Sequence, residues 1–270
     1  MDRWESMSIK TTARRYIIEI LLLMSKNFAY TQKIGLAKGL KRKGGLGFLP
    51  QKYLPTKEEK FLINLDLNGK TVYDVGAYKG LFTMFFARAV GESGRVIAFE
   101  PNDENFNDIL QNIRLNNFGN VVVRKIALGR ASGKVSLAFS PGVSREGSIQ
   151  ENIKAKILGK KGAKSIEVNI DSLDNQMIIQ NLPKPDIVKI DVEGLELDVL
   201  EGMKQTIARY NPQLIIEIHG HDVQGKIDNI KKVVRVLIDF GYSIYHIESE
   251  NRITLSNSEI AKEGHLYCKK

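Results

Sequence analysis

The sequence predicts an α/β protein with an open, mostly parallel β-sheet flanked by helices. The first observation is residues 71–101, in which a β-branched apolar run (71–75), a glycine turn, an apolar helical stretch (81–90) and a second apolar run (95–99) follow one another. This order is that of a βαβ unit, whose two strands are parallel. The second observation is the composition, 43% hydrophobic and 26% charged over 270 residues, which is typical of a globular chain with a sizeable core.

The remaining segments support the same fold class, because strand-like and helix-like patterns alternate along the chain. Apolar runs bounded by turn residues indicate strands, and apolar residues at helical spacing indicate helices. Further strands are expected at 121–123, 134–139, 165–170, 185–191, 212–221, 242–247 and 265–268, the last as the closing edge strand, and further helices at 57–67, 103–116, 196–204 and 227–240.

Positive charge is concentrated near the N-terminus. Residues 1–60 hold 13 Lys and Arg against 5 Asp and Glu, whereas residues 61–270 hold 27 against 26, so the formal net charge of +9 belongs mainly to the first segment. We therefore divide the chain into a basic N-terminal extension (1–60) and a main domain (61–270). A nearly neutral main domain disfavours a nucleic-acid partner, whose binding normally needs a basic groove.

The N-terminal extension contains an apolar run at residues 16–24 and a basic, glycine-rich segment at 39–47. The apolar run is broken by Glu19 and is shorter than the ~20 residues of a membrane span. It also lacks the small-x-small cleavage site of a signal peptide. We expect it to be helical and either docked on the main domain or in peripheral contact with a membrane surface. The segment 39–47 either binds an anionic group of a substrate or is a solvated linker.

Cysteine is rare in the sequence. The single residue of this type, Cys268, allows no disulfide within the chain and leaves no cysteine cluster for structural zinc. This usage fits a reducing compartment, and we therefore expect a cytoplasmic location.

A ligand site is expected at the first glycine turn. Asp74, Gly76 and Gly80 form the pattern D-x-G-x-x-x-G, and Glu100 ends the next strand 24 residues after Gly76. Glycines let the backbone approach a ligand, the helix start offers free N–H groups, and a strand-end carboxylate can accept hydrogen bonds from ribose hydroxyls. The dinucleotide fingerprint G-x-G-x-x-G is absent, and a carboxylate at its first position would repel a pyrophosphate. A cationic adenosine compound suits this pattern better, and S-adenosylmethionine is such a compound.

Polar residues also collect at the ends of the later strands. Asp191, Glu193, Glu217 and His219 lie at or just beyond the carboxyl ends of the two strands expected at 185–191 and 212–221. Because ligands of open α/β sheets bind beyond the carboxyl ends of the strands, these four residues are candidates for catalysis. A single acid at such a position is equally often a helix cap.

The segment 217–222 reads Glu-x-His-x-His-Asp and offers ligand types that suit a divalent cation. Its spacing matches no established metal-binding signature. We therefore treat a divalent metal as an alternative that the sequence leaves open and predict no metal site.

Five segments spread over about residues 70–220 carry a family resemblance. They read VYDVGAYKGLFT, AFEPN, ALG, VKIDVEGLELDVLEGM and PQLIIEIHG, in this order. Together they resemble the FkbM family of methyltransferases. The resemblance implies a Rossmann-like methyltransferase fold with a seven-stranded sheet, S-adenosylmethionine as methyl donor and, usually, O-methylation of a sugar, glycan or polyketide hydroxyl. The sequence departs from the family at Tyr78, where many relatives carry Asn.

The resemblance and the strand-end positions lead to specific expectations for the site. Asp191 is the first candidate to orient the donor or to accept the proton of the acceptor hydroxyl, with Glu193, Glu217 and His219 as alternatives. The residues expected to bind the donor are Asp74, Gly76, Ala77, Gly80, Glu100, Pro101, Ala127 and Asp191.

The acceptor is expected to be a small metabolite, a glycan or a lipid-linked saccharide. Two other functions stay open: an RNA or DNA methyltransferase, which is disfavoured because no N-P-P-[YF] motif follows the fourth strand, and a non-catalytic module that binds S-adenosylmethionine. The basic, glycine-containing segment 140–164 is expected to form a mobile lid over the substrate.

Overall fold

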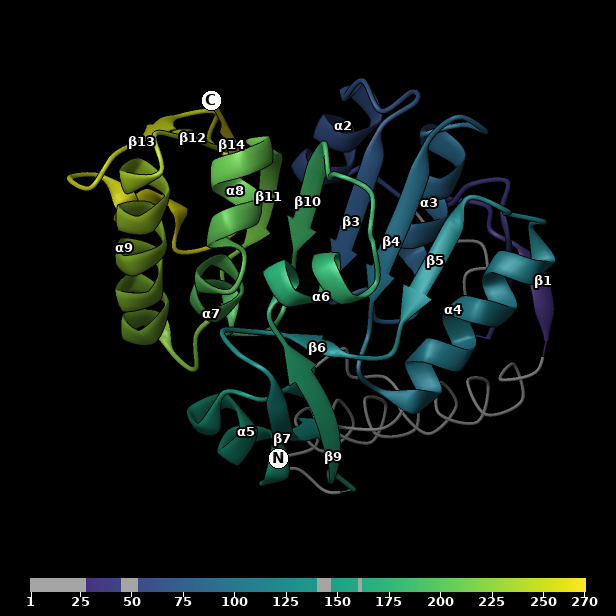
Figure 1. The fold of residues 1–270 in the computed structure, drawn as a ribbon, viewed down its shortest axis with the longest axis horizontal. Helices are drawn as coiled ribbons and strands as arrows, with labels where there is room; N and C mark the ends of the chain where they lie inside the picture. The colour runs from purple at the N-terminus through teal and green to yellow at the C-terminus, as the bar shows by residue number, and fades with distance from the viewer. Residues whose placement is uncertain (1–27, 45–52, 140–146, 160–161) are drawn as a thin grey trace, which may run out of the picture.

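The computed structural model places a large β-sheet at the centre of the protein, with helices on both faces (Figure 1). It describes residues 28–44, 53–139, 147–159 and 162–270. The strands of the large sheet are β3 (Thr71–Val75), β4 (Arg95–Phe99), β5 (Val121–Arg124), β10 (Ile187–Ile190), β11 (Gln213–Glu217), β12 (Ser243–His246), β13 (Arg252–Ile253) and β14 (His265–Lys269).

The order of these strands is β13-β12-β14-β11-β10-β3-β4-β5. The five strands from β11 to β5 are parallel to one another, and β14 is antiparallel to both β11 and β12. The expectation of a mostly parallel sheet is therefore confirmed. Within the described residues the sheet has eight strands instead of the expected seven, because the two-residue strand β13 pairs with β12 at one edge.

The prediction that residues 265–268 form the closing edge strand is wrong. The strand β14 lies between β11 and β12 and is hydrogen-bonded on both sides. Leu266 and Cys268 are fully buried there. Alternating apolar residues indicate which face of a strand is buried, but they carry no information about the order in which strands pair.

The helices are α2 (Lys57–Asn64), α3 (Leu81–Ala89), α4 (Asp103–Leu115), α5 (Glu151–Leu158), α6 (Leu173–Ile179), α7 (Glu196–Glu201), α8 (Lys204–Tyr210) and α9 (Val223–Asp239). Alternate residues of one strand enter different cores: Tyr73 belongs to a buried cluster that includes residues of α7, α8 and α9, and Val72 belongs to one that includes residues of α2 and α3. Because both faces of the sheet are covered, its central strands are apolar throughout, as in other parallel sheets.

A second, smaller sheet lies beyond the carboxyl ends of the parallel strands (Figure 1). It consists of β6 (Ala127–Leu128), β9 (Lys164–Asp171), β7 (Gly133–Phe139) and β8 (Gly147–Ser148), and α5 packs against β7 and β8. The segment predicted as a lid, 140–164, thus contains a helix that the sequence did not predict. Residues 140–146 and 160–161 of that segment lie outside the described residues.

The described part of the N-terminal extension packs on the main domain. A hairpin of β1 (Ala29–Thr31) and β2 (Lys41–Lys43) lies against α4, where the backbone N–H groups of Lys41 and Lys43 donate to Asn116 and Asn112. Residues 41–43 are therefore part of a paired strand and not a solvated linker. The helix α2 runs across the predicted boundary at residue 60.

The apolar run at 16–24 lies outside the described residues, so its predicted docking or membrane contact stays a prediction. Among the helices in the described ranges, none has the length and apolar character that crossing a membrane requires.

Candidate active site

A cavity of about 370 Å³ lies at the carboxyl ends of β3, β4, β10 and β11 and is bordered by the smaller sheet. It brings together most of the residues that the sequence analysis selected. Those that line it are Gly76, Ala77, Glu100, Pro101, Ala127, Asp191, Glu193 and Glu217. Asp74, Gly80 and His219 do not line the cavity, although each lies close to residues that do.

The glycine turn after β3 forms one wall of the cavity. Gly76 has a φ of +85°, and a Cβ at this position would overlap the backbone carbonyl oxygen of Asp191. Only glycine fits such a close approach of two backbones at positive φ. Gly80 has a structural role instead, because it precedes α3 with a φ of +76° and packs against Ile109 of α4.

Glu100 lies on this wall with both carboxylate oxygens fixed by the backbone. Its Oε2 accepts a hydrogen bond from the N–H of Tyr78 at 2.8 Å, and its Oε1 accepts one from the N–H of Asn102 at 2.8 Å. Burial raises the pKa of Glu100 to about 7, although these hydrogen bonds favour the charged form. Tyr78 adopts a φ of +50°, a conformation that Asn tolerates better than Tyr. It is also the position at which this sequence departs from the family pattern, since many relatives carry Asn there.

Asp74 lies below the cavity and not on its surface. Its side chain is 1% exposed and accepts a hydrogen bond of 2.6 Å from the hydroxyl of Thr83 in α3. Burial raises the pKa of Asp74. The expectation that Asp74 contacts a ligand directly is not supported by this position, which instead joins the end of β3 to the start of α3.

Lys189, which the sequence analysis did not select, lies beside Asp74 as its register partner on β10. It is 1% exposed, and its Nζ lies 3.0 Å from Oδ2 of Asp191 and 4.2 Å from the centre of the Phe82 ring. Burial alone would lower the pKa of Lys189, but the surrounding carboxylates outweigh it and raise the pKa. This lysine is therefore a permanent positive charge beneath the cavity.

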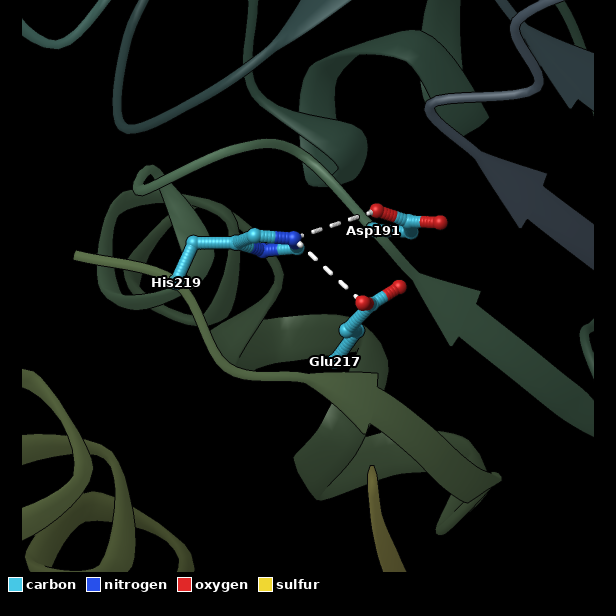
Figure 2. A group of neighbouring side chains, drawn as sticks. All are labelled: Asp191, Glu217 and His219. Carbon is cyan, nitrogen blue, oxygen red and sulfur yellow. Dashed lines mark ion pairs between the residues drawn. The ribbon is translucent and has the colours of Figure 1, made fainter. Parts of the chain in front are cut away.

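His219 is surrounded by carboxylates from several elements. Its Nδ1 lies 2.9 Å from Oε1 of Glu196 in α7. Its Nε2 faces Glu217 at 3.5 Å and Asp191 at 3.9 Å, as Figure 2 shows, and also Glu193 at 3.6 Å. Burial would lower the pKa of His219, but the hydrogen bonds to Glu196 and Glu217 raise it to about 11. His219 is thus protonated near neutral pH.

Glu217 lies between two histidines. His265 is its register partner on β14, and Nε2 of His265 lies 3.6 Å from Oε2 of Glu217. Burial would raise the pKa of Glu217, but the hydrogen bonds from His219 and His265 lower it well below its usual range. The same Nε2 lies 3.3 Å from Oε1 of Glu58, a residue of α2 that also lines the cavity. Neither His265 nor Glu58 was selected from the sequence.

Glu193 occupies the turn after β10 with a φ of +51°, and its carbonyl oxygen accepts a hydrogen bond of 2.7 Å from Ser148 of the smaller sheet. Burial raises the pKa of Glu193 to about 7, against the opposing charge of His219. The carboxylate of Glu193 thus titrates close to neutral pH.

The two histidines of the segment 217–222 do not share a site. The strand β11 ends at Glu217, so both histidines lie in the loop that follows. His221 is half-exposed and pairs with Asp222 at 2.9 Å. The group of potential metal-ligating atoms within the described residues is instead Asp191, Glu217 and His219, whose ligand atoms lie within 4.8 Å of one another.

Comparisons with known proteins point in one direction. The family described as the methyltransferase FkbM domain matches residues 74–244, more than half of the chain. The chain is similar to Methyltransferase 1 of Beauveria bassiana, with 27% identity over 49% of this chain and 57% of that protein. It is also similar to the hexuronic acid methyltransferase AglP of Haloferax volcanii, with 30% identity over 55% of this chain and 56% of that protein. The matched region spans a little over half the length of each of these relatives.

Among solved structures, the methyltransferase FkbM of Methylobacillus flagellatus KT is similar, with a TM-score of 0.49 and 18% identity. The alignment covers 77% of this chain and 45% of that chain.

Proposed function

Because the chain belongs to the methyltransferase FkbM family, we propose that it transfers the methyl group of S-adenosylmethionine to a hydroxyl oxygen of a sugar, glycan, lipid-linked saccharide or other small metabolite. The observation that carries this proposal is the cavity, which has two chemically different halves. One half surrounds Glu100 and the glycine turn, and the other surrounds Asp191, Glu193 and Glu217.

The residues of the first half fit S-adenosylmethionine. Gly76 lines this half, and the absence of a side chain there lets the glycine turn pack against the Asp191 backbone to form one wall. The fixed carboxylate of Glu100 has lone pairs left to accept hydrogen bonds from ribose hydroxyls. Ile126, Ala127 and Leu128 provide an apolar lining that suits adenine. When bound, the donor supplies a methyl group on a positively charged sulfur.

In the second half, we assign the role of general base to Glu193. A hydroxyl is a weak nucleophile, and a base is most effective when its pKa lies near the working pH. The pKa of Glu193, about 7, meets this condition. The carboxylate of Glu193 accepts the hydroxyl proton as the new oxygen–methyl bond forms and the sulfur–methyl bond breaks.

The other three candidates suit other roles. Asp191 is held by Lys189 and is placed to orient the reactants. Glu217 is held in its charged form by two histidines, and a strongly stabilised carboxylate is a poor base. His219 is protonated near neutral pH and cannot accept a proton.

A carbohydrate-like acceptor fits the acidic character of this half. Carboxylates accept hydrogen bonds, and a sugar presents several hydroxyl donors. The similarity to a hexuronic acid methyltransferase supports a carbohydrate acceptor, and the acidic lining favours a neutral sugar over an anionic one. A nucleic-acid acceptor is less compatible, because an acidic lining repels phosphates.

The experiment that tests the proposal is isothermal titration of the purified protein with S-adenosylmethionine, and with NAD and single-stranded RNA for comparison. We expect binding of S-adenosylmethionine alone, and a loss of at least tenfold in affinity for Glu100→Ala. Glu92→Ala is the matched control, because Glu92 lies exposed before the other end of β4. If Glu100→Ala binds S-adenosylmethionine as tightly as the unmodified protein does, the donor assignment is wrong. Labelled-methyl transfer to glycan and metabolite fractions then identifies the acceptor.

A further inference from the structure

We propose that Asp191, Glu217 and His219 form a binding site for one divalent cation of the Mn²⁺ or Zn²⁺ class at the acceptor end of the cavity. The ligand atoms are Oδ1 of Asp191, Oε1 of Glu217 and Nε2 of His219, which lie within 4.8 Å of one another (Figure 2). The Nε2 atom is 3.5 Å from the Glu217 oxygen and 3.9 Å from the Asp191 oxygen. A metal with bonds of about 2.0–2.2 Å and tetrahedral geometry holds its ligand atoms about 3.4 Å apart.

These separations suit a bridging cation better than direct contacts. At 3.5 Å and beyond, a hydrogen bond between an imidazole nitrogen and a carboxylate oxygen is longer and weaker than the usual one of about 2.7–3.2 Å. Glu193 faces the same Nε2 atom at 3.6 Å. Three carboxylates thus surround one imidazole nitrogen at distances longer than a normal hydrogen bond. A cation between them would have both oxygen and nitrogen ligands.

The other side of the imidazole has the arrangement that accompanies metal-ligating histidines. Such a histidine usually donates its second ring N–H to a carboxylate, which fixes the orientation of the ring. Here Nδ1 of His219 lies 2.9 Å from Glu196, which is fully buried. Glu196 is itself fixed by hydrogen bonds from the N–H of Gly194 and the side-chain amide of Asn229. Nε2 is therefore held toward Asp191 and Glu217.

In each ligand carboxylate, one oxygen faces a basic side chain and the other faces His219. Oδ2 of Asp191 pairs with Lys189 at 3.0 Å, and its Oδ1 faces His219. Oε2 of Glu217 lies 3.6 Å from His265, and its Oε1 faces His219. The partners that hold the outer oxygens thus orient the inner oxygens toward a common point.

Glu58 adds to the negative charge at this end of the cavity. It lines the same cavity, is 9% exposed, and its Oε1 lies 3.3 Å from Nε2 of His265. A buried carboxylate favours an added positive charge in the cavity.

The ligand set of one neutral imidazole and two carboxylates suits Mn²⁺ and Zn²⁺. The protonated state of His219 described above is that of the cation-free site, so binding of the cation displaces the Nε2 proton and releases it to solvent. Such a cation would polarise an acceptor hydroxyl and favour the loss of its proton. This catalytic consequence rests on the proposed function, whereas binding of the cation does not.

The test is a titration of the full chain, stripped with a chelator and dialysed, with Mn²⁺, monitored by the electron paramagnetic resonance signal of the free ion. We expect one Mn²⁺ per chain, displaced by Zn²⁺. His219→Ala and Asp191→Asn should each weaken binding at least tenfold, and Glu196→Gln should weaken it about 10- to 100-fold through the orientation of His219. His221→Ala is the matched control and should bind Mn²⁺ unchanged, because His221 pairs with Asp222 outside the group.

The proposal is overturned if neither Mn²⁺ nor Zn²⁺ binds the stripped protein in a one-to-one ratio, or if His221→Ala weakens binding as much as His219→Ala does. Circular dichroism identifies any variant that fails to fold, and Asp191→Asn, which keeps the side-chain shape, then replaces His219→Ala. Titration of the same stripped protein with S-adenosylmethionine separates this outcome from failure of the proposed function. Donor binding without metal binding contradicts the metal site alone.

Discussion

The Nζ of Lys189 lies 3.0 Å from Oδ2 of Asp191, and this buried ion pair connects the two halves of the cavity. Lys189 is also the register partner of Asp74, which anchors the glycine turn beside the donor half. Asp191 lines the acceptor half. The buried ammonium group of Lys189 thus offsets the negative charge of carboxylates in both halves. It therefore stabilises the ends of both β3 and β10.

Replacing Lys189 by Met should therefore destabilise the protein strongly. The substitution keeps an unbranched apolar side chain but leaves Asp74 and Asp191 without their buried cation, and breaking a buried pair in this way costs about 3–5 kcal/mol. Urea unfolding followed by circular dichroism measures the free energy of unfolding.

The control for this prediction is Lys134→Met, which removes an ion pair with Glu167 in which both side chains are mostly exposed. Surface pairs contribute little, so the urea midpoint of this variant should stay unchanged. A Lys189→Met variant with the same midpoint as Lys134→Met would show that the buried charge is not needed.

Gly76→Ala should be far more damaging than alanine at another glycine of similar conformation. Gly76 and Gly241 have φ values of +85° and +80°, but a Cβ at Gly76 would overlap the Asp191 carbonyl, whereas a Cβ at Gly241 meets nothing within 4 Å. The left-handed conformation alone costs about 1–2 kcal/mol. We expect Gly241→Ala to lower the free energy of unfolding by that amount. Gly76→Ala should lower it further and should also abolish S-adenosylmethionine binding. Thermal unfolding and titration calorimetry measure both, and equal losses in the two variants would contradict the close approach.

The rate of methyl transfer should depend on pH through Glu193. Only the charged carboxylate can accept a proton, and burial raises the pKa of Glu193 to about 7. The turnover rate should therefore rise as the pH increases through about 7 and then level off. Glu193→Gln should lower the rate about 10²-fold, as removal of a general base does, and should abolish this rise.

Glu167→Gln, a change on the exposed side of the smaller sheet, should keep the full pH profile. If Glu193→Gln retains the rise near pH 7, another group acts as the base, and Asp191 becomes the first candidate again.

The donor half of the cavity was predictable from local sequence. The glycine turn after β3 and the acid after β4 lie within one βαβ unit, so chain geometry alone brings Gly76 and Glu100 to the same wall. Asp74 shows the limit of this reasoning. A pattern can place a residue at a strand end, but it cannot tell whether the side chain reaches the cavity or turns below it toward Thr83.

The acceptor half was less predictable, because it is assembled from distant segments. Glu58, Glu196 and His265 come from α2, α7 and β14, and only the pairing of β14 with β11 places His265 beside Glu217. Lys189 did carry a local signal. A lysine inside a four-residue apolar strand is buried, and a buried lysine almost always has a charged partner.

His265 should make the stability of the protein depend on pH above neutrality. Burial would lower the pKa of His265, but the hydrogen bonds to Glu217 and Glu248 and the charge of Glu58 raise it from 6.5 to about 9. Because the pKa is higher in the folded protein, the stabilisation is complete below about pH 6.5 and disappears as the pH rises to about 9. The difference corresponds to roughly 3 kcal/mol.

Urea unfolding at pH 6.5 and at pH 9 measures this loss, and His265→Gln should show a much smaller change between the two conditions. His221→Gln, at a histidine that is half-exposed, should behave like the unmodified protein. His265→Gln removes no other titrating group, so the difference between its pH dependence and that of the unmodified protein is due to His265. An unchanged pH dependence in His265→Gln would mean that Glu217 is held in its charged form by His219 alone.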